Sequence, residues 1–463
     1  MENQGRRRCR KLVLVPCPFQ GHINPMLQLG TILHSRGFSI TIAHAQFNSP
    51  QTSNHPDFVF LSLPDGTSSK PAMPHDFLPF MSKLNFNCKD PFQEILSLMI
   101  EKQEQDDQLP CIIFEIFMSF AQEVASHLKL PNIIFHTNSV ATLLTFLAYA
   151  RLKAEGYTPP QDSTSTELVP GLHPLRFKDL PVTNFAHLDG MWRVIAMLSN
   201  IGSSSAIIWN TMDCLEQSVL AQYQRQCQVP NFSIGPMHKI ASAPSSSLLE
   251  EDSSCISWLD KQGHNSVIYA SFGSIASVDA KELTEMAWGL ANSQQTFLWV
   301  LRPDPAKGSE PSDCLPDDFK ETVGERGCIV KWAPQQLVLA HSSVGGFLSH
   351  CGWNSTLESI SEGVPMICKP AFGDQLINTR YISHEWGNGF ELENDLGRGE
   401  IERAIKMLMV EKEGQEMRQR AAELKEKTQV SIKSGSGHPS YECSEILQLS
   451  YVVTVWMSLT LCN

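Results

Sequence analysis

The sequence predicts an α/β protein with two domains, each built around a parallel β-sheet. At 463 residues the chain is longer than a single hydrophobic core usually supports. Short apolar runs typical of buried strands alternate with amphipathic helix patterns, and strand–helix–strand units of this kind form parallel sheets. A small, polar and then acidic stretch separates the two halves. We expect an N-terminal domain over 1–240, a linker over 241–252, a C-terminal domain over 253–436 and an atypical tail over 437–463.

The first half opens with a strand–helix–strand unit. The apolar run 12–15 predicts a strand, and Asn24 and Pro25 predict the cap and first position of the helix that follows. Residues 38–42 alternate between apolar and polar types, which predicts the next strand. His22 would then follow the carboxyl end of the first strand, where open α/β sheets bind ligands. Further buried strands are expected at 111–114, 133–135 and 206–209.

Residues 48–90 are rich in proline, and apart from a strand near 58–61 we expect irregular structure there. Phe77, Phe80 and Phe86 are candidates for the wall of an apolar pocket, and ordinary packing explains them equally well. Pro91 predicts the start of a helix.

The second half repeats the alternation. Strands are expected at 266–271 and 297–301, and Asp279 and Glu282 have the spacing of a capping box for the helix between them. Two helices with polar faces are expected near the end of this half, over 400–410 and 413–433.

The stretch 332–375 carries the clearest chemistry. An apolar strand at 344–348 leads through a tight connection into a helix that Asn354 or Ser355 would cap and Gly363 would end. A small-residue loop at a helix N-terminus offers backbone N–H groups and a positive dipole to an anion. His350, Asn354 and Ser355 add side-chain donors, so a diphosphate is the anion that best uses the site.

Other residues of the stretch suit the rest of a nucleotide sugar. The flat face of Trp332 suits base stacking, and Ala333 with Gln335 suits the edge of a base. Glu358, one turn into the helix, suits two ribose hydroxyls. Asp374 and Gln375 begin another helix and suit sugar hydroxyls. The joint pattern, more than any single residue, indicates a nucleotide-sugar site.

This stretch resembles the signature segment of the plant family 1 UDP-glycosyltransferases, and the resemblance extends from about residue 11 to about residue 441. It implies the GT-B fold, with two Rossmann-like domains whose parallel sheets face a central cleft. It implies UDP-glucose as donor substrate, because a final glutamine is associated with glucose, and no cofactor or metal. The sequence as a whole resembles that of the group with terpenoid and cytokinin glucosyltransferases. The expected donor site comprises Ser274, Trp332, Ala333, Gln335, His350, Trp353, Asn354, Ser355, Glu358, Asp374 and Gln375.

The resemblance also implies a mechanism. His22, in the segment Gln20-Gly21-His22-Ile23-Asn24-Pro25, would be the general base that takes a proton from the acceptor hydroxyl. Displacement from the opposite face of the sugar would give a β-glucoside. The family usually places an aspartate at the end of the strand where this chain has Glu115, one methylene longer. We expect Glu115 to orient His22 and stabilise the imidazolium that forms in the transition state.

The composition limits the alternatives. The net charge of −13 argues against nucleic acid and anionic membranes as partners. The 13 cysteines include no CxxC pair, which favours free thiols in the cytosol. The apolar run 451–463 is too short to span a bilayer.

We expect a cytosolic monomer that acts on a small apolar acceptor such as a terpenoid, phenolic or hormone. The alternative is a UDP-sugar-binding protein with little catalysis, motivated by Glu115 and the tail. An oxidoreductase is disfavoured because no strand is followed by GxGxxG.

Overall fold

The structure is a computed structural model. It describes residues 10–67, 77–102, 109–157, 165–181, 188–200, 204–241, 247–274, 280–302, 315–392, 397–434 and 449. The chain forms two compact units. The first unit comprises Met1–Leu147, His187–Leu248 and Ser431–Asn463, and the second comprises Ala148–Ala186 and Leu249–Val430. The boundary after Leu248 falls inside the expected linker. The segment Ala148–Ala186 was expected in the N-terminal domain, but its contacts group it with the second unit.

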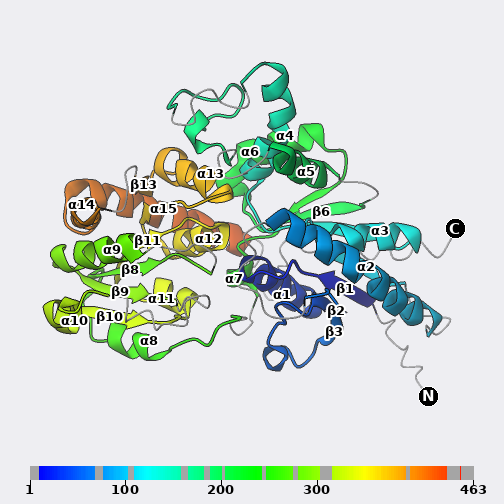
Figure 1. The fold of residues 1–463 in the computed structure, drawn as a ribbon, viewed down its shortest axis with the longest axis horizontal. Helices are drawn as coiled ribbons and strands as arrows, with labels where there is room; N and C mark the ends of the chain where they lie inside the picture. The colour runs from blue at the N-terminus through cyan, green and yellow to red at the C-terminus, as the bar shows by residue number, and fades with distance from the viewer. Residues whose placement is uncertain are drawn as a thin grey trace. The chain divides into compact units, whose positions relative to one another are not determined.

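The first unit contains a seven-stranded sheet in the order β3-β2-β1-β4-β5-β6-β7, and every strand pair in it is parallel (Figure 1). Its strands are β1 (Arg10–Val15), β2 (Phe38–Ala45), β3 (Val59–Leu63), β4 (Cys111–Glu115), β5 (Asn132–His136), β6 (Ala206–Trp209) and β7 (Asn231–Ser233). Its helices are α1 (Gln20–His34), η1 (Thr52–Asn54), α2 (Phe77–Glu101), α3 (Ser119–His127), α5 (Leu188–Ser199), α6 (Asp213–Gln226) and α7 (Met237–Ile240), and α4 (Val140–Ala154) begins in this unit and ends in the second.

The core of the first unit follows the two-residue period of its strands. Leu12 and Leu14 of β1 pack with Ile113 of β4 in a cluster that also includes the buried face of α1. Leu449 is buried in the same cluster and is the one residue of the expected tail that the structure describes.

Two helices of the first unit begin earlier than the sequence predicted. The helix α1 begins at Gln20, because the Phe19 carbonyl accepts hydrogen bonds from the N–H groups of both His22 and Ile23. Asn24 is therefore not its cap, and Pro25 lies inside it. The helix α2 covers 25 residues with Pro91 inside, so the irregular structure expected over 77–90 is wrong.

The second unit contains a six-stranded sheet in the order β10-β9-β8-β11-β12-β13, also with parallel pairs throughout. Its strands are β8 (Val267–Ser271), β9 (Thr296–Val300), β10 (Gly327–Val330), β11 (Val344–Ser349), β12 (Met366–Cys368) and β13 (Gly389–Glu391). Its helices are η2 (Phe177–Asp179), α8 (Ser254–Leu259), α9 (Ala280–Asn292), α10 (Phe319–Val323), η5 (Gly324–Arg326), α11 (Gln335–Ala340), α12 (Trp353–Glu362), α13 (Asp374–Arg380), η6 (Tyr381–Glu385) and α14 (Arg398–Met409), and α15 (Lys412–Ser434) begins in this unit and ends in the first.

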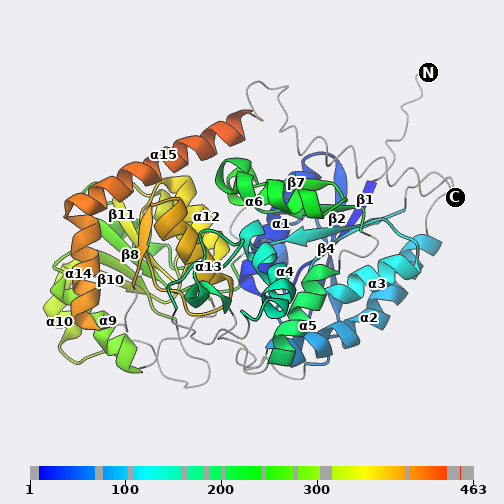
Figure 2. The ribbon, with the colours of Figure 1, turned by 90° about the horizontal axis from the view of Figure 1, so that it is seen from above.

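Both faces of this second sheet are buried. Ile268 and Ala270 of β8 pack on one side with α9 and α14, which lie next to each other (Figure 2). Val267 and Tyr269 of the same strand pack on the other side with α8 and α11. Burial on both faces explains why these strands read as continuous apolar runs in the sequence.

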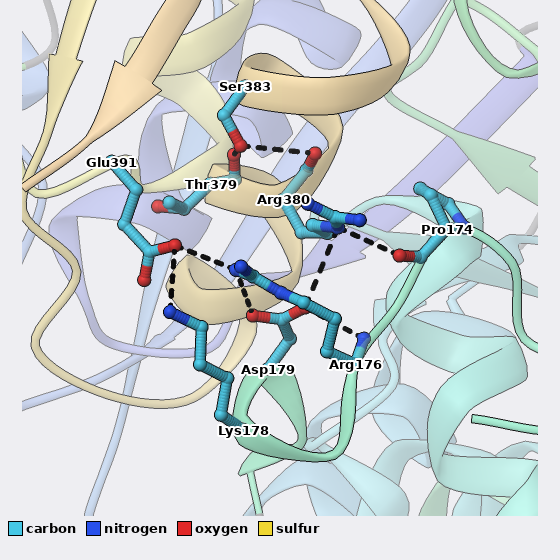
Figure 3. A network of polar contacts seen from close by, with 8 residues as sticks. All are labelled: Pro174, Arg176, Lys178, Asp179, Thr379, Arg380, Ser383 and Glu391. Atoms are coloured by element: carbon cyan, nitrogen blue, oxygen red, sulfur yellow. Dashed lines mark hydrogen bonds and ion pairs between the residues drawn. The ribbon is translucent and has the colours of Figure 1, made fainter. Parts of the chain in front are cut away.

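A network of charged side chains holds the segment Ala148–Ala186 to the rest of the second unit (Figure 3). Arg176 donates to Asp179 Oδ1 at 2.8 Å and to Glu391 Oε2 at 2.7 Å. Arg380 lies 3.8 Å from Asp179 Oδ2 and donates to the Pro174 carbonyl at 2.8 Å. Burial lowers the pKa of Arg176, but its hydrogen bonds to Asp179 and Glu391 more than offset this and raise it overall. The network therefore keeps its charges paired.

In the part of the chain that the structure describes, no helix is both long enough and apolar enough to cross a membrane.

Candidate active site

His22 and Glu115 meet where the strand order of the first sheet reverses. From β1 the chain proceeds to β2 and β3 on one side, whereas β4 lies on the other side of β1. His22 is the third residue of α1, directly after β1, and Glu115 is the last residue of β4. Open parallel sheets place ligands at this position, outside the carboxyl ends of the strands.

The two side chains form a hydrogen-bonded pair. His22 Nδ1 lies 3.1 Å from Glu115 Oε1, and the Phe117 N–H donates to the other carboxylate oxygen at 2.9 Å. Glu115 is 1% exposed, whereas the His22 side chain is 24% exposed. The Glu115 side chain thus reaches the imidazole, and each of its two carboxylate oxygens has a hydrogen-bond partner. A proton on Nδ1 satisfies this contact and leaves Nε2 as the acceptor.

Thr137, which was not among the residues predicted from the sequence, completes this cluster. Its hydroxyl oxygen lies 2.8 Å from His22 Nδ1, and the hydroxyl donates to Glu115 Oε1 at 3.3 Å. Thr137 follows β5, which pairs with β4. A polar residue directly after a buried strand is the signal that points to it, but only once β5 is known to lie beside β4.

Aromatic rings gather around His22. The ring of Phe19 lies 6.3 Å from the imidazole and about equally close to Phe77 and Phe80, at 5.9 Å from each. Phe117 contacts His22 edge-on at 6.0 Å and Phe77 at 5.3 Å. Phe77 and Phe80, two of the phenylalanines expected near a pocket, therefore contact the rings that pack against His22.

The third such phenylalanine does not belong to this group. Phe86 is 81% exposed on α2, so its assignment to the pocket wall is wrong.

In the second unit, the turn between β11 and α12 is built around His350. The helix α12 begins at Trp353 after Gly352, so Asn354 and Ser355 lie in its first turn and are not its cap. Gly363 ends the helix in the left-handed region at φ 69°, as predicted. The first N–H groups of an α-helix have no intrahelical acceptor, and they point toward this turn.

The imidazole of His350 is enclosed by glycines. A Cβ on Gly273 would lie 2.5 Å from His350 Cε1, and one on Gly352 would lie 2.6 Å from His350 Nε2. Burial, with a smaller contribution from the positive charge of Arg302, lowers the pKa of His350 to about 4. A hydrogen bond to the Ser271 backbone opposes this shift only in part, so His350 is neutral near pH 7 and carries one ring proton, which can go to one acceptor at a time.

The residues expected to hold the base and the ribose contact one another. Gln335 donates from Nε2 to Glu358 Oε2 at 2.7 Å and to Ser355 Oγ at 2.9 Å, and Tyr269 donates to its Oε1 at 3.2 Å. Ala333 is buried and Trp332 is half-buried, and both lie in the connection between β10 and α11. Gln335 and Glu358, expected at the base edge and at the ribose, therefore contact each other, and Trp332 and Ala333 precede Gln335 in the chain.

The residues expected to hold the sugar follow β12. Gln375 is buried, and its Oε1 accepts from the N–H groups of Ala371 at 2.9 Å and Phe372 at 3.3 Å. Asn378 donates both to Asp374 Oδ2 at 3.2 Å and to the Cys351 carbonyl at 3.0 Å. Asn378, which the sequence analysis did not single out, thus joins the Asp374 turn to the His350 turn.

Ser274 and Trp353 differ from the other expected donor residues. Arg302 donates to the Ser274 carbonyl at 2.6 Å, which fixes the turn after β8 beside His350. The Trp353 indole is 4% exposed and packs 6.3 Å from the Trp386 ring, so the structure places this side chain in the interior. Except for Trp353, the expected donor side chains lie at the carboxyl ends of β8, β10, β11 and β12, around the reversal of strand order between β8 and β11.

Solved structures identify this architecture. Phytolacca americana UGT2, complexed with UDP-2fluoro-glucose and pterostilbene, superposes with a TM-score of 0.80 at 26% identity, over 97% of this chain and 100% of that one. A UDP-glucose: anthocyanidin 3-O-glucosyltransferase in complex with UDP gives 0.81 at 25% identity, over 97% and 100%. Two parallel α/β sheets with a polar site at the ends of each define the class as GT-B glycosyltransferases.

Sequence relatives narrow the class. The family described as "UDP-glucoronosyl and UDP-glucosyl transferase" matches residues 199–426. UDP-glycosyltransferase 76E1 of Solanum lycopersicum is 50% identical over 91% of this chain and 88% of that protein. Flavonol 3-O-glucosyltransferase UGT76E12 of Arabidopsis thaliana is 47% identical over 96% of this chain and 97% of that protein. The chain belongs to the plant UDP-glycosyltransferases and is an enzyme of that family, which confirms the resemblance to the family. The expected resemblance to the terpenoid and cytokinin group stays a prediction.

Proposed function

We propose that the protein transfers glucose from UDP-glucose to a hydroxyl group of a small phenolic acceptor, with inversion to the β-glucoside. The hydrogen-bonded pair of His22 and Glu115, 3.1 Å apart, carries this proposal, because it supplies a base held in the tautomer that can accept a proton. The phenyl rings beside His22 favour a planar aromatic acceptor. The flavonol glucosyltransferase relative supports the same acceptor class.

The reaction needs two tasks from the protein. His22 Nε2 takes the acceptor proton as the hydroxyl oxygen attacks the anomeric carbon, and Glu115 stabilises the imidazolium that forms. The bond from that carbon to the diphosphate breaks, and the negative charge moves onto UDP. The first turn of α12, with His350, Asn354 and Ser355, stabilises that charge through hydrogen bonds and the helix dipole, so that this step does not call for a metal ion.

The remaining donor residues hold UDP-glucose in place. Trp332 stacks on uracil, Gln335 binds its edge, and Glu358 binds the ribose. The contact between Gln335 and Glu358, at 2.7 Å, positions both side chains before the nucleotide arrives. Asp374 and Gln375 bind the glucose hydroxyls. The hydrogen bond from Asn378 to the Cys351 carbonyl joins the turn that holds the diphosphate to the turn that holds the sugar.

The test is release of UDP from UDP-glucose with a panel of flavonols, stilbenes, terpenoid alcohols and hormones. We expect release that requires an acceptor, with the phenolics fastest, and a product whose anomeric proton shows the β configuration by NMR. Tight binding of UDP-glucose without consumption across the panel would instead establish a UDP-sugar-binding protein. An α-glucoside product would contradict direct displacement.

A further inference from the structure

Three side chains that can bind a metal ion converge in the first unit. The Sγ atom of Cys17, a ring nitrogen of His22 and a carboxylate oxygen of Glu115 all lie within 4.8 Å of one another. Cys17 is fully buried and Glu115 is 1% exposed, whereas His22 opens the group to one side. The proposed reaction uses His22 and Glu115 but gives no role to the thiol.

We propose that these three side chains form an inhibitory site for a divalent transition metal ion such as Zn²⁺. Thiolate, imidazole and carboxylate are the three ligand types that zinc binds in proteins, and three protein ligands leave a fourth position for water. Hard ions such as Mg²⁺ prefer oxygen ligands and fit this set poorly.

The geometry needs only a small adjustment. Zinc bonds of about 2.0–2.3 Å in a tetrahedral arrangement place neighbouring ligand atoms roughly 3.3–3.7 Å apart. His22 Nδ1 and Glu115 Oε1 are already 3.1 Å apart. The ligand atoms lie within 4.8 Å of one another, so Cys17 Sγ must approach the other two by no more than about 1.5 Å, a movement on the scale of a side-chain rotation.

The charges of the group balance on binding. Without a metal, burial and the nearby charge of Glu115 raise the pKa of the Cys17 thiol well above its usual value, so the thiol is protonated. A divalent cation displaces that proton to solvent and binds the thiolate, the carboxylate and the neutral imidazole. The resulting site has no net charge, which suits a position that is almost fully buried.

Metal binding also changes the tautomer of His22. Coordination uses the Nδ1 lone pair, so the single ring proton moves to Nε2. A neutral imidazole with its proton on Nε2 cannot accept a proton there. The metal therefore switches off the base without touching the donor site. This consequence rests on the proposed role of His22, whereas metal binding itself does not.

The direct test is titration of the whole purified protein with Co²⁺, which reports sulfur ligation through a thiolate-to-cobalt charge-transfer absorbance. We compare wild type with Cys17→Ser, and with Cys88→Ser as the control, because Cys88 is also fully buried in the first unit but lies outside the group. We expect wild type and Cys88→Ser to show the absorbance, and Cys17→Ser to lose one equivalent of it. Identical spectra for all three proteins would overturn the proposal.

A second measurement tests the inhibition. In the presence of EDTA, Cys17→Ser should transfer glucose at the wild-type rate. In a separate assay without EDTA, Cys17→Ser should require at least tenfold more Zn²⁺ than wild type for half inhibition. Loss of the cobalt signal with unchanged zinc inhibition would overturn the inhibitory role. If the wild type transfers no sugar even with EDTA, the proposed function fails, and the cobalt spectra still decide whether the site exists.

Discussion

His22 Nδ1 and Glu115 Oε1 lie 3.1 Å apart, although the two residues are 93 positions apart in the chain. The contact is the one expected of an orienting carboxylate, and in this chain a glutamate makes it. Its second oxygen accepts from the Phe117 N–H, so the extra methylene does not leave the carboxylate loose.

Replacement of Glu115 tests this pair directly. In Glu115→Gln the charge that stabilises the imidazolium is lost, and we expect kcat to fall by about 100-fold or more. Glu115→Asp keeps the charge on a shorter side chain and should lose about tenfold, since misplacement by about 1 Å is costly. Rates are measured as UDP release at saturating donor. An unchanged rate in Glu115→Gln would remove Glu115 from the mechanism.

Thr137 should act through His22 and not on its own. Thr137→Val removes the hydroxyl that contacts both members of the pair, and we expect kcat to fall by about tenfold, roughly 1.4 kcal/mol of transition-state stabilisation. Thr137→Ser keeps a hydroxyl and should retain most activity. The Thr137→Val effect should shrink when Glu115 is already glutamine. Equal losses in the valine and serine variants would point to packing alone.

Gly273 should be needed for donor binding. An alanine there would place its Cβ 2.5 Å from His350 Cε1, at a residue with φ +67°. We expect Gly273→Ala to weaken binding of UDP by at least tenfold in calorimetry. Gly324→Ala is a matched control, because Gly324 has φ +56° in the same unit but nothing within 4 Å of the added atom. If both variants weaken UDP binding equally, backbone strain and not His350 is responsible.

Asp179 should contribute strongly to the stability of the second unit. Asp179→Asn leaves Arg176 and Arg380 without their shared carboxylate in a mostly buried site, and we expect a loss on the order of 3 kcal/mol in denaturant unfolding. Glu285→Gln is the comparison, since Glu285 pairs with Arg398 near the surface of the same unit. Exposed pairs contribute about 0–1 kcal/mol. A similar loss in both variants would contradict a special role for the Arg176 network.

His136 should make the stability of the first unit depend on pH. Burial, only partly opposed by a hydrogen bond to Asn138, lowers the pKa of His136 to about 3, and its ring stacks on Trp209 at 4.2 Å. Between pH 6.5 and 3 the unfolded chain binds a proton that the folded chain does not. The free energy of unfolding should therefore decrease as the pH is lowered through this window, by up to about 1.4 kcal/mol per pH unit.

The control for this pH dependence is a histidine on the surface. His136→Phe keeps the stacked ring and should flatten the dependence, whereas a change at the exposed His127 should leave it as in wild type. Denaturant midpoints at several pH values give the comparison. Equal slopes in wild type and His136→Phe would show that other groups cause the effect.

The strands β4, β5, β6 and β8 were predictable because they are short runs, mostly apolar, that are buried at every position. Ala206–Trp209 was predicted with its observed bounds, and the first strand was missed only at Arg10 and Lys11. The helix α2 was mistaken because Pro91 was read as a start. The buried residues Met81, Leu84, Cys88, Phe92 and Leu96 nonetheless recur at intervals of three and four and carried the helix signal.

The site was predictable where one segment carries it. Gln335, Ser355 and Glu358 lie close in sequence and meet in space, so their pattern was visible in the chain. Thr137 was not visible, because its role depends on β5 lying beside β4. The contact between Arg176 and Glu391 joins residues 215 positions apart, and no local pattern predicts such a pair.

The Arg176 network also decides where two related enzymes can be recombined. A chimera with its crossover at residue 240 would take Arg176 and Asp179 from one parent and Glu391 and Arg380 from the other. Any mismatch between the parents would then leave a mostly buried charge without its partner. A chimera that transplants Ala148–Ala186 together with Leu249–Val430 inherits the whole network from one parent. The second unit of this enzyme, taken as an exchangeable module, is therefore discontinuous in sequence.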